Sequence, residues 1–179
     1  MQISVKHDLE QFQRGLNDFQ KKQLPKATQW AINQTGKKVG RQMLKEVAKE
    51  AGVAQKVLKK RGFYASARAS VKNLMFQVRV RYGAIPLKDF RPVQTKVGVR
   101  HKAWGEKQVA KGAFIVNSIG GHVFKRRTSA RLPIDKLHGP VPARLFMAQS
   151  TQVRAVEVVK SYFPDRLRMG LKRYTRPRG

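Results

Sequence analysis

Two stretches in the middle of the chain alternate between hydrophobic and polar residues. They cover residues 74–82 and 93–100. Alternation with a period of two is typical of a half-buried strand, so each stretch predicts one β-strand with a basic outer face. We expect an open antiparallel sheet with one face on helices. The inward positions would be Leu74, Phe76, Val78, Val80 and Tyr82 in the first strand, and Val93, Thr95, Val97 and Val99 in the second.

A third region predicts a β-hairpin that leads into a basic loop. The apolar runs 113–116 and 123–124 flank Gly120-Gly121, and glycine adopts positive φ at both turn positions at little cost. A connector with several prolines, residues 128–141, then leads to the last helix. The cations after the hairpin are Lys125, Arg126, Arg127 and Arg131.

Hydrophobic residues at helical spacing predict two helices near the N-terminus. After a short strand over residues 2–6, the first helix would run from a cap at Asp8 to about Lys22. The second would begin at Pro25, and the helical part would end near Arg61. The apolar positions are Leu9, Phe12, Leu16 and Phe19 in the first helix and Val39, Met43, Val47 and Ala51 in the second, with Lys38, Arg41, Lys45 and Lys49 opposite.

The C-terminal part predicts a long helix that opens at Pro142 and is kinked or interrupted at Pro164. Leu145, Val156, Val159 and Phe163 would share its apolar side, and a basic tail follows. The predicted fold is therefore α+β: an antiparallel sheet of about four strands packed against N-terminal helices and a long C-terminal helix, with long loops. We expect a single domain over 1–179, helical over 8–61, with strands and loops over 66–127 and the C-terminal helix and tail over 142–179.

The charge narrows the classes of partner. The chain has 39 Lys and Arg against 10 Asp and Glu, a formal charge of +29, which indicates a polyanionic partner such as nucleic acid. There is no cysteine, so neither disulfides nor thiolate metal sites are expected, and synthesis in the cytoplasm is favoured. We expect no signal peptide and no membrane span.

Catalytic chemistry is not indicated. The histidines, His7, His101, His122 and His138, show no metal-binding spacing, and no nucleophile, phosphate-loop or dinucleotide motif occurs. The carboxylates are scattered, with Asp89, Glu106 and Asp135 alone in basic loops, whereas a metal-dependent nuclease needs them clustered. We expect neither an enzyme nor a bound cofactor or metal.

Four segments in series resemble the phage minor tail protein Z family: IPLKDFRPVQTKVGV, KGAFIV, VFKRR and RLPIDKLHGP. The resemblance is densest from Ile85 to Pro140, and Val141 departs from it where serine commonly follows Gly-Pro. It implies an α+β tail completion protein without catalysis, which forms a ring, as a hexamer, at the head-proximal end of a long non-contractile tail in the virion. Implied partners are further copies, a tail terminator or tail tube protein, head-completion or connector proteins, and viral genomic DNA in the lumen.

Two sets of site residues follow. The first set consists of basic residues that would face either DNA or a neighbouring subunit, and the sequence leaves both alternatives open. These residues are Lys125, Arg126, Arg127, Arg131, Arg79, Arg81, Lys96 and Arg100. Candidates for assembly loops are Ile85, Pro86, Leu87, Phe90, Leu132, Pro133 and Ile134. The loops 83–92 and 104–111 would reach neighbours. The rival hypothesis is a free-standing, sequence-independent nucleic-acid-binding protein associated with ribosomes or the nucleoid.

Overall fold

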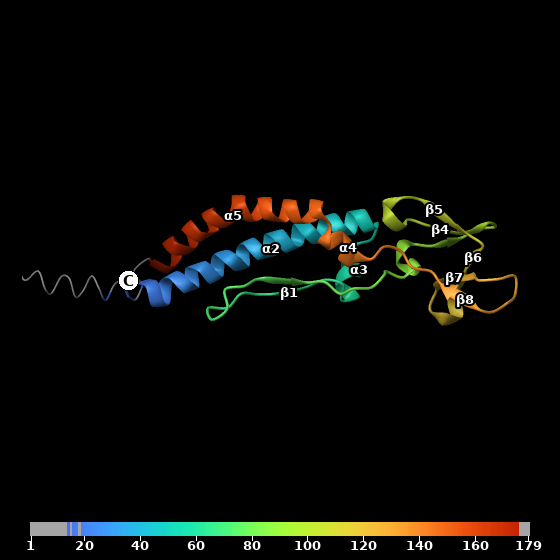
Figure 1. The fold of residues 1–179 in the computed structure, drawn as a ribbon, viewed down its shortest axis with the longest axis horizontal. Coiled ribbons are helices and arrows are strands. Elements are labelled where there is room, and N and C mark those ends of the chain that lie inside the picture. The colour runs from blue at the N-terminus through green and yellow to red at the C-terminus, as the bar shows by residue number, and fades with distance from the viewer. Residues whose placement is uncertain (1–13, 15, 18, 176–179) are drawn as a thin grey trace, which may run out of the picture. The chain divides into compact units, whose positions relative to one another are not determined.

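The computed structural model describes residues 14, 16, 17 and 19–175 (Figure 1). The strand predicted over residues 2–6, the cap at Asp8, Leu9 and Phe12 lie outside the described residues. In the described part, the helical elements are the π-helical turn η1 (Phe19–Gln23), α2 (Leu24–Ala51), α3 (Gln55–Lys60), α4 (Pro142–Met147), α5 (Gln149–Thr175) and the 3-10 turns η2 (Leu87–Phe90), η3 (Ala103–Gly105) and η4 (Asn117–Ile119).

The strands confirm the predicted α+β class. They form three small sheets, β1-β2, β3-β4-β5 and β6-β7-β8, where one sheet of about four strands was expected. The strands are β1 (Ala65–Ala67), β2 (Gln77–Arg79), β3 (Val93–Gln94), β4 (Gly98–His101), β5 (Gln108–Lys111), β6 (Ala113–Val116), β7 (His122–Arg126) and β8 (Ile134–Lys136). None of the described helices has the length and apolar character that a membrane crossing needs.

The chain divides into two compact units. Among the described residues, unit 1 takes those up to Gly40, residues 66–77 and those from Arg154 onward, and unit 2 takes 41–65 and 78–153. The expectation of a single domain stays a prediction.

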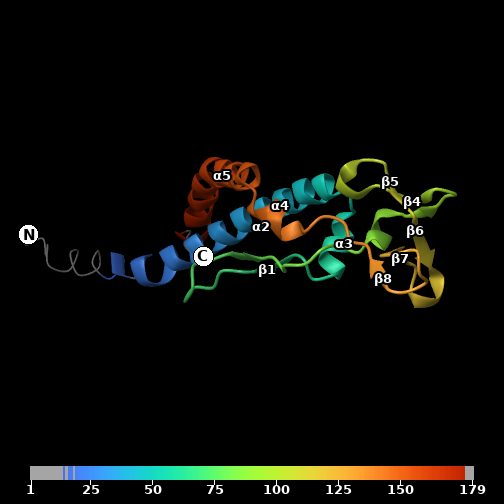
Figure 2. The ribbon, with the colours of Figure 1, turned by 45° about the vertical axis from the view of Figure 1, so that its right-hand side comes forward.

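In unit 1, the first part of α2 packs along α5 (Figures 1 and 2). The contact is close at Gly170, where a Cβ atom would lie 2.9 Å from the carbonyl oxygen of Ala27. The segment 66–77 also packs on α2, because the Asn33 side chain both donates to and accepts from the backbone of Ala69, at 3.0 and 2.9 Å. Gly170 of α5 and the Asn33 side chain of α2 therefore position these two neighbours of α2.

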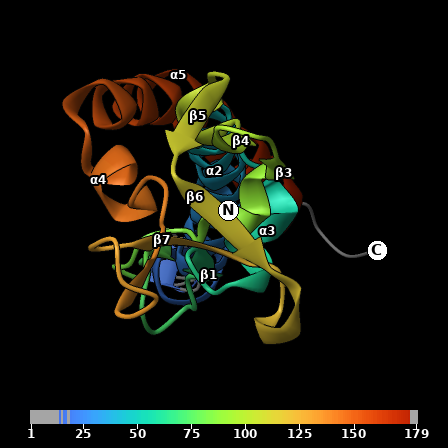
Figure 3. The same cartoon turned by 90° about the vertical axis from the view of Figure 1, so that its right-hand side faces the viewer.

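The core of unit 2 packs the second half of α2 and α3 against the two three-stranded sheets; Figure 3 shows the course of these elements. As predicted, α2 turns Val47 and Ala51 inward, both fully buried, while Lys45 and Lys49 are exposed. Apolar positions spaced by three and four residues thus face the core. The buried cluster consists of Leu44, Val47, Ala48, Ala51, Leu58, Phe63, Ile85, Leu87, Phe90, Val99, Ala103, Ala113, Val123 and Phe146.

Both strands predicted from alternation were too long. The first is limited to β2, and Leu74 and Tyr82, expected inward, are 42% and 68% exposed. The second is two strands, β3 and β4, joined by a turn in which the Thr95 N–H and hydroxyl donate to the Gly98 carbonyl at 2.7 and 2.8 Å. A side-chain hydrogen bond that stabilises a turn leaves no trace in a period-two pattern.

Two helix boundaries also differ from the prediction. Pro25 does not start a separate helix, because η1 runs directly into α2; a π-helical turn just before a proline fits the loss of its N–H donor. In the C-terminal part, Pro164 does not interrupt the helix, because it lies inside α5; the interruption falls instead at Ala148 (ψ 137°), between α4 and α5.

The break at Ala148 changes which side of the last helix is buried. Leu145 belongs to α4, so counting helical positions from it into α5 fails. Of the residues of α5 predicted inward, Val156 and Val159 are 50% and 42% exposed and Phe163 is half-buried; Val158 and Tyr162, which were not predicted inward, are half-buried too.

The prediction of a flexible loop over residues 104–111 was wrong for the second half of that segment. Residues 108–111 are β5, which pairs with β4 in antiparallel register, His101 opposite Gln108. Likewise, the connector 128–141 contains β8, which pairs with β7.

Candidate nucleic-acid interface

The hairpin predicted around Gly120-Gly121 is confirmed as β6 and β7. Phe114 lies opposite Phe124, and both glycines have positive φ, 75° and 68°, which glycine adopts without steric cost. The Gly121 N–H donates to the Val116 carbonyl at 3.1 Å and closes the turn.

The basic residues that follow the turn have different surroundings. Lys125 and Arg126 lie on β7 and not in a loop, and both are exposed. The Arg126 guanidinium carbon lies 5.1 Å from the centre of the Phe114 ring, a cation–π geometry. Arg131 is exposed in the segment between β7 and β8. Among the described residues, neither Lys125 nor Arg131 is paired with a carboxylate.

Arg127 is held by an acid of its own chain. Its Nε and Nη2 donate to Asp135 at 2.9 and 2.8 Å, the two-pronged geometry that makes arginine–carboxylate pairs specific. Hydrogen bonding to Arg127 lowers the pKa of Asp135, and the same bond raises the pKa of Arg127. Arg127 is therefore anchored to β8.

Two of the three acids that were predicted to be isolated, Asp89 and Asp135, form ion pairs. Besides Asp135, Asp89 forms an ion pair and a 2.8 Å hydrogen bond with Arg61. This pair lies beside a pocket of about 360 Å³, which Val57 and Lys60 also line. The pairing of Asp89 and Asp135 corrects the expectation that both were isolated.

The strand cations do not form the two shared faces that alternation predicted. Arg79 ends β2 and Arg81 lies beyond that strand. Lys96 lies in the turn between β3 and β4, whereas Arg100 lies on β4. All four are exposed. Their role towards DNA or a subunit stays a prediction.

The predicted assembly loops divide into buried and exposed parts. Ile85, Leu87 and Phe90 are at most 3% exposed and belong to the core of unit 2, and Pro86 is buried too. In the other loop Leu132 is 67% exposed, Pro133 is exposed and Ile134 is half-buried on β8. Packing within the chain already accounts for the first group; the assembly role of both groups stays a prediction.

Two of the segments that carried the family resemblance are paired with each other. The Ile85 N–H donates to the Pro140 carbonyl at 3.1 Å, and the Gly139 N–H donates to the Ile85 carbonyl at 2.7 Å. The Leu87 N–H donates to Leu137 at 3.1 Å. The segments IPLKDF and DKLHGP therefore form one packed element in unit 2.

The histidines of the described residues do not form a metal site. No group of three potential ligands occurs in the part of the chain that the structure describes. Burial lowers the pKa of His101, and burial followed by the charge of Lys136 lowers that of His122. Both imidazoles are therefore neutral at neutral pH.

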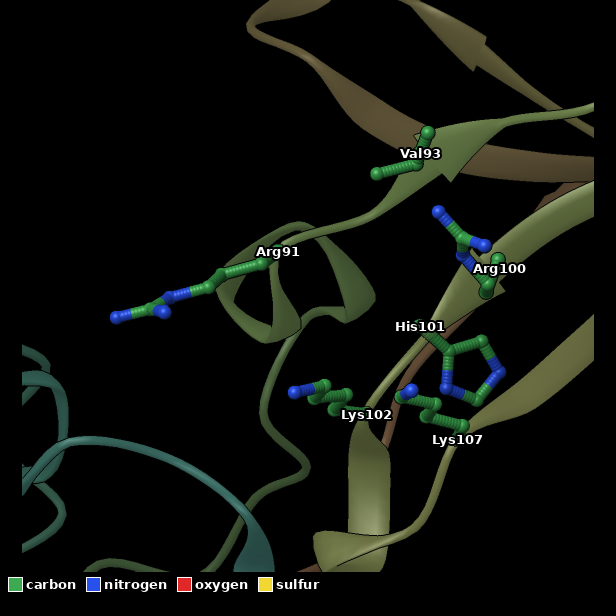
Figure 4. A pocket seen from close by; sticks show the side chains of 6 residues that line it. All are labelled: Arg91, Val93, Arg100, His101, Lys102 and Lys107. Carbon is green, nitrogen blue, oxygen red and sulfur yellow. The ribbon is translucent and has the colours of Figure 1, made fainter.

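A basic pocket of about 200 Å³ lies on the β3-β4-β5 sheet of unit 2 (Figure 4). Among the described residues that line it, none is acidic and only one is aliphatic. The lining residues are Arg91, Val93, Arg100, His101, Lys102 and Lys107.

Three of these cations, Arg91, Lys102 and Lys107, were not among the residues singled out from the sequence. Of the three, Lys107 lies in the segment 104–111, where the sequence predicts a flexible loop, so that prediction gives its charge no fixed position. The signal that could have found Lys102 and Lys107 is the density of cations around a histidine in RHKAWGEK, residues 100–107; it does not extend to Arg91.

A family model described as prophage minor tail protein Z (GPZ) matches residues 7–177 of the chain. No curated protein and no solved structure matches it. The match spans both units and all the described helices and strands.

Proposed function

We propose that this chain, which belongs to the prophage minor tail protein Z family and so has a structural role in a phage tail, completes that tail as a ring at its head-proximal end. The ring, a hexamer, would contact head-completion or connector proteins on one side and a tail terminator or tail tube protein on the other. The family match over residues 7–177 is the observation that carries the proposal.

The composition supports a DNA path through this ring. A formal charge of +29 on 179 residues suits a surface that contacts phosphates without reading bases. Contacts of this kind bind any sequence and weaken steeply as salt rises. Ring closure needs two different complementary surfaces on each copy, which the exposed loop around Leu132 and the exposed strand cations could supply.

The structure changes which residues best test the hairpin. Replacing Arg126 or Arg127 would also remove a contact within the chain, to Phe114 or Asp135. Lys125 and Arg131 are exposed without such contacts, so Lys125→Ala with Arg131→Ala probes the surface alone. Lys45→Ala with Lys56→Ala is the matched control, because both lysines are exposed on helices of unit 2.

The experiment counts copies of the protein on purified tails and measures infectivity for the parent and both variants. We expect a hexamer on each parental tail; one or two copies would overturn the ring. If the hairpin faces DNA, Lys125→Ala with Arg131→Ala keeps full occupancy and lowers DNA delivery. If it faces a neighbouring subunit, occupancy itself falls. Normal occupancy with normal infectivity, equal to the control, would exclude both roles.

A further inference from the structure

The basic pocket on the β3-β4-β5 sheet gathers charge that nothing in its own lining neutralises. Arg91, Arg100, Lys102 and Lys107 contribute four cations around about 200 Å³. Like charges held together repel one another unless an anion is bound between them. A pocket with several cations and no carboxylate is therefore complementary to an anion.

The strands hold these cations in fixed positions. Val93 lies opposite Arg100 across β3 and β4, and the Lys102 N–H donates to the Phe90 carbonyl at 3.3 Å. Lys107 directly precedes β5, whose first residue, Gln108, pairs with His101. Figure 4 shows Arg100, His101, Lys102 and Lys107 gathered together, while the Arg91 side chain extends away from them.

His101 also lines this pocket, and its hydrogen bond defines the tautomer of its ring. The residue is 6% exposed, and its Nδ1 accepts a hydrogen bond from the Ala103 N–H at 3.3 Å. In a neutral imidazole that accepts at one nitrogen, the other nitrogen carries the hydrogen. Nε2 therefore carries the hydrogen, and the ring adds no negative charge to the lining.

Backbone strain is concentrated beside this pocket. In the described part of the chain, Arg91 (φ 52°) and Trp104 (φ 59°) are the two non-glycine residues with positive φ. Arg91 lines the pocket, and Trp104 lies between two lining residues, Lys102 and Lys107. Strained backbone of this kind clusters at ligand-binding sites.

We propose that this pocket binds a phosphate group, and that in the assembled tail this group is a phosphodiester of the DNA backbone. Arginine can meet a phosphate with two parallel N–H bonds, and lysine adds point charges. Phosphate contact without base contact is what sequence-independent binding requires. The DNA part of this inference rests on the proposed function; the phosphate site itself does not.

The first arm uses inorganic phosphate alone, at constant ionic strength, with the full-length chain carrying Trp30→Phe. Trp104, next to the pocket, is then the sole tryptophan, since the chain has two. We expect a saturable change in its fluorescence that is lost in Lys102→Gln with Lys107→Gln. It should persist in the control, Lys45→Gln with Lys56→Gln. If the Trp104 fluorescence shows no saturable change with phosphate, the assignment of this pocket as a phosphate site is wrong.

The second arm titrates short duplexes of two unrelated sequences. The pocket variant should lose about tenfold in affinity and the control only about two- to threefold, although both remove two charges. Arg100→Lys keeps the positive charge but removes the paired N–H donors of the guanidinium, so it should weaken DNA binding. The control is Arg41→Lys, at an exposed position of α2, which should leave DNA binding unchanged. Equal losses in pocket and control variants would overturn the DNA assignment and leave a site for free phosphate.

Circular dichroism of each variant verifies folding, which is expected because Arg100, Lys102 and Lys107 are exposed. Copy number on purified tails separates this inference from the proposed function. If the pocket variant keeps full occupancy but loses DNA affinity, both stand. If DNA affinity is unchanged but occupancy falls, the pocket contacts an acidic surface of another tail protein, and the DNA assignment is wrong while the structural role stands.

Discussion

Replacing Phe90 by alanine tests whether the segment 85–90 is core or assembly surface. The Phe90 ring is 1% exposed, at the end of η2, and packs so closely on Gly139 that a Cβ atom there would lie 2.6 Å from it. Removing a buried phenylalanine ring costs about 3–5 kcal/mol, from lost burial and the cavity that remains. Domains of this size are stable by only about 5–15 kcal/mol.

The assay is urea unfolding followed by Trp104 fluorescence in a Trp30→Phe background. With a slope of about 2 kcal/mol per molar urea, Phe90→Ala should lower the midpoint for unit 2 by roughly 2 M. Leu132→Ala is the control, because that side chain is 67% exposed and should change stability by less than about 0.5 kcal/mol.

A size exchange makes the test sharper. Gly139→Ala alone should destabilise, because its methyl group meets the ring, while Phe90→Leu leaves space beside the same position. The double variant should therefore be more stable than the sum of the two single effects predicts. A Phe90→Ala variant within about 1 kcal/mol of the parent would refute the core assignment, and reduced tail occupancy of such a variant would then favour an assembly surface.

Two further predictions concern the helices and pH. Gly170→Ala should destabilise unit 1 by about 1–3 kcal/mol, because its methyl group would meet the Ala27 carbonyl at 2.9 Å; unfolding followed by Trp30 fluorescence in a Trp104→Phe background measures this, and an unchanged midpoint would contradict the close packing. Burial lowers the pKa of His101 from its ordinary 6.5, so the unfolded chain binds the proton more readily and stability falls as pH drops below about 6.5. Urea unfolding at pH 7.5 and 5.5 should show a smaller acid loss in His101→Gln than in the parent, with a residual loss from His122; an equal loss in both would argue against this contribution.

Local patterns predicted those parts of the fold that local chemistry determines. The pair Gly120-Gly121 located the hairpin, because positive φ is needed there. Helical spacing located the buried side of α2. The turn after Gln94 was missed, since its hydrogen bonds from Thr95 do not interrupt the alternation of side chains. The break at Ala148 was missed as well, and it shifted the expected buried side of α5.

The candidate site depends more on contacts between residues distant in the sequence. Arg61 and Asp89 are separated by 28 positions, and no spacing rule indicates that they pair. The basic pocket likewise forms only because β4 pairs with β3 and β5, which brings Arg100 and Lys107 into one lining. The sequence showed an excess of cations, but the strand register decides which of them share one pocket.

The backbone pairing of residues 85–87 with 137–140 has a consequence for chimeras of family members. The two segments are about fifty positions apart along the chain, yet they exchange hydrogen bonds between Ile85 and both Gly139 and Pro140. A crossover placed between them would join halves from different parents within one packed element. Crossovers before Ile85 or after Pro140 keep that element from a single parent, so residues 85–140 are best exchanged as one block.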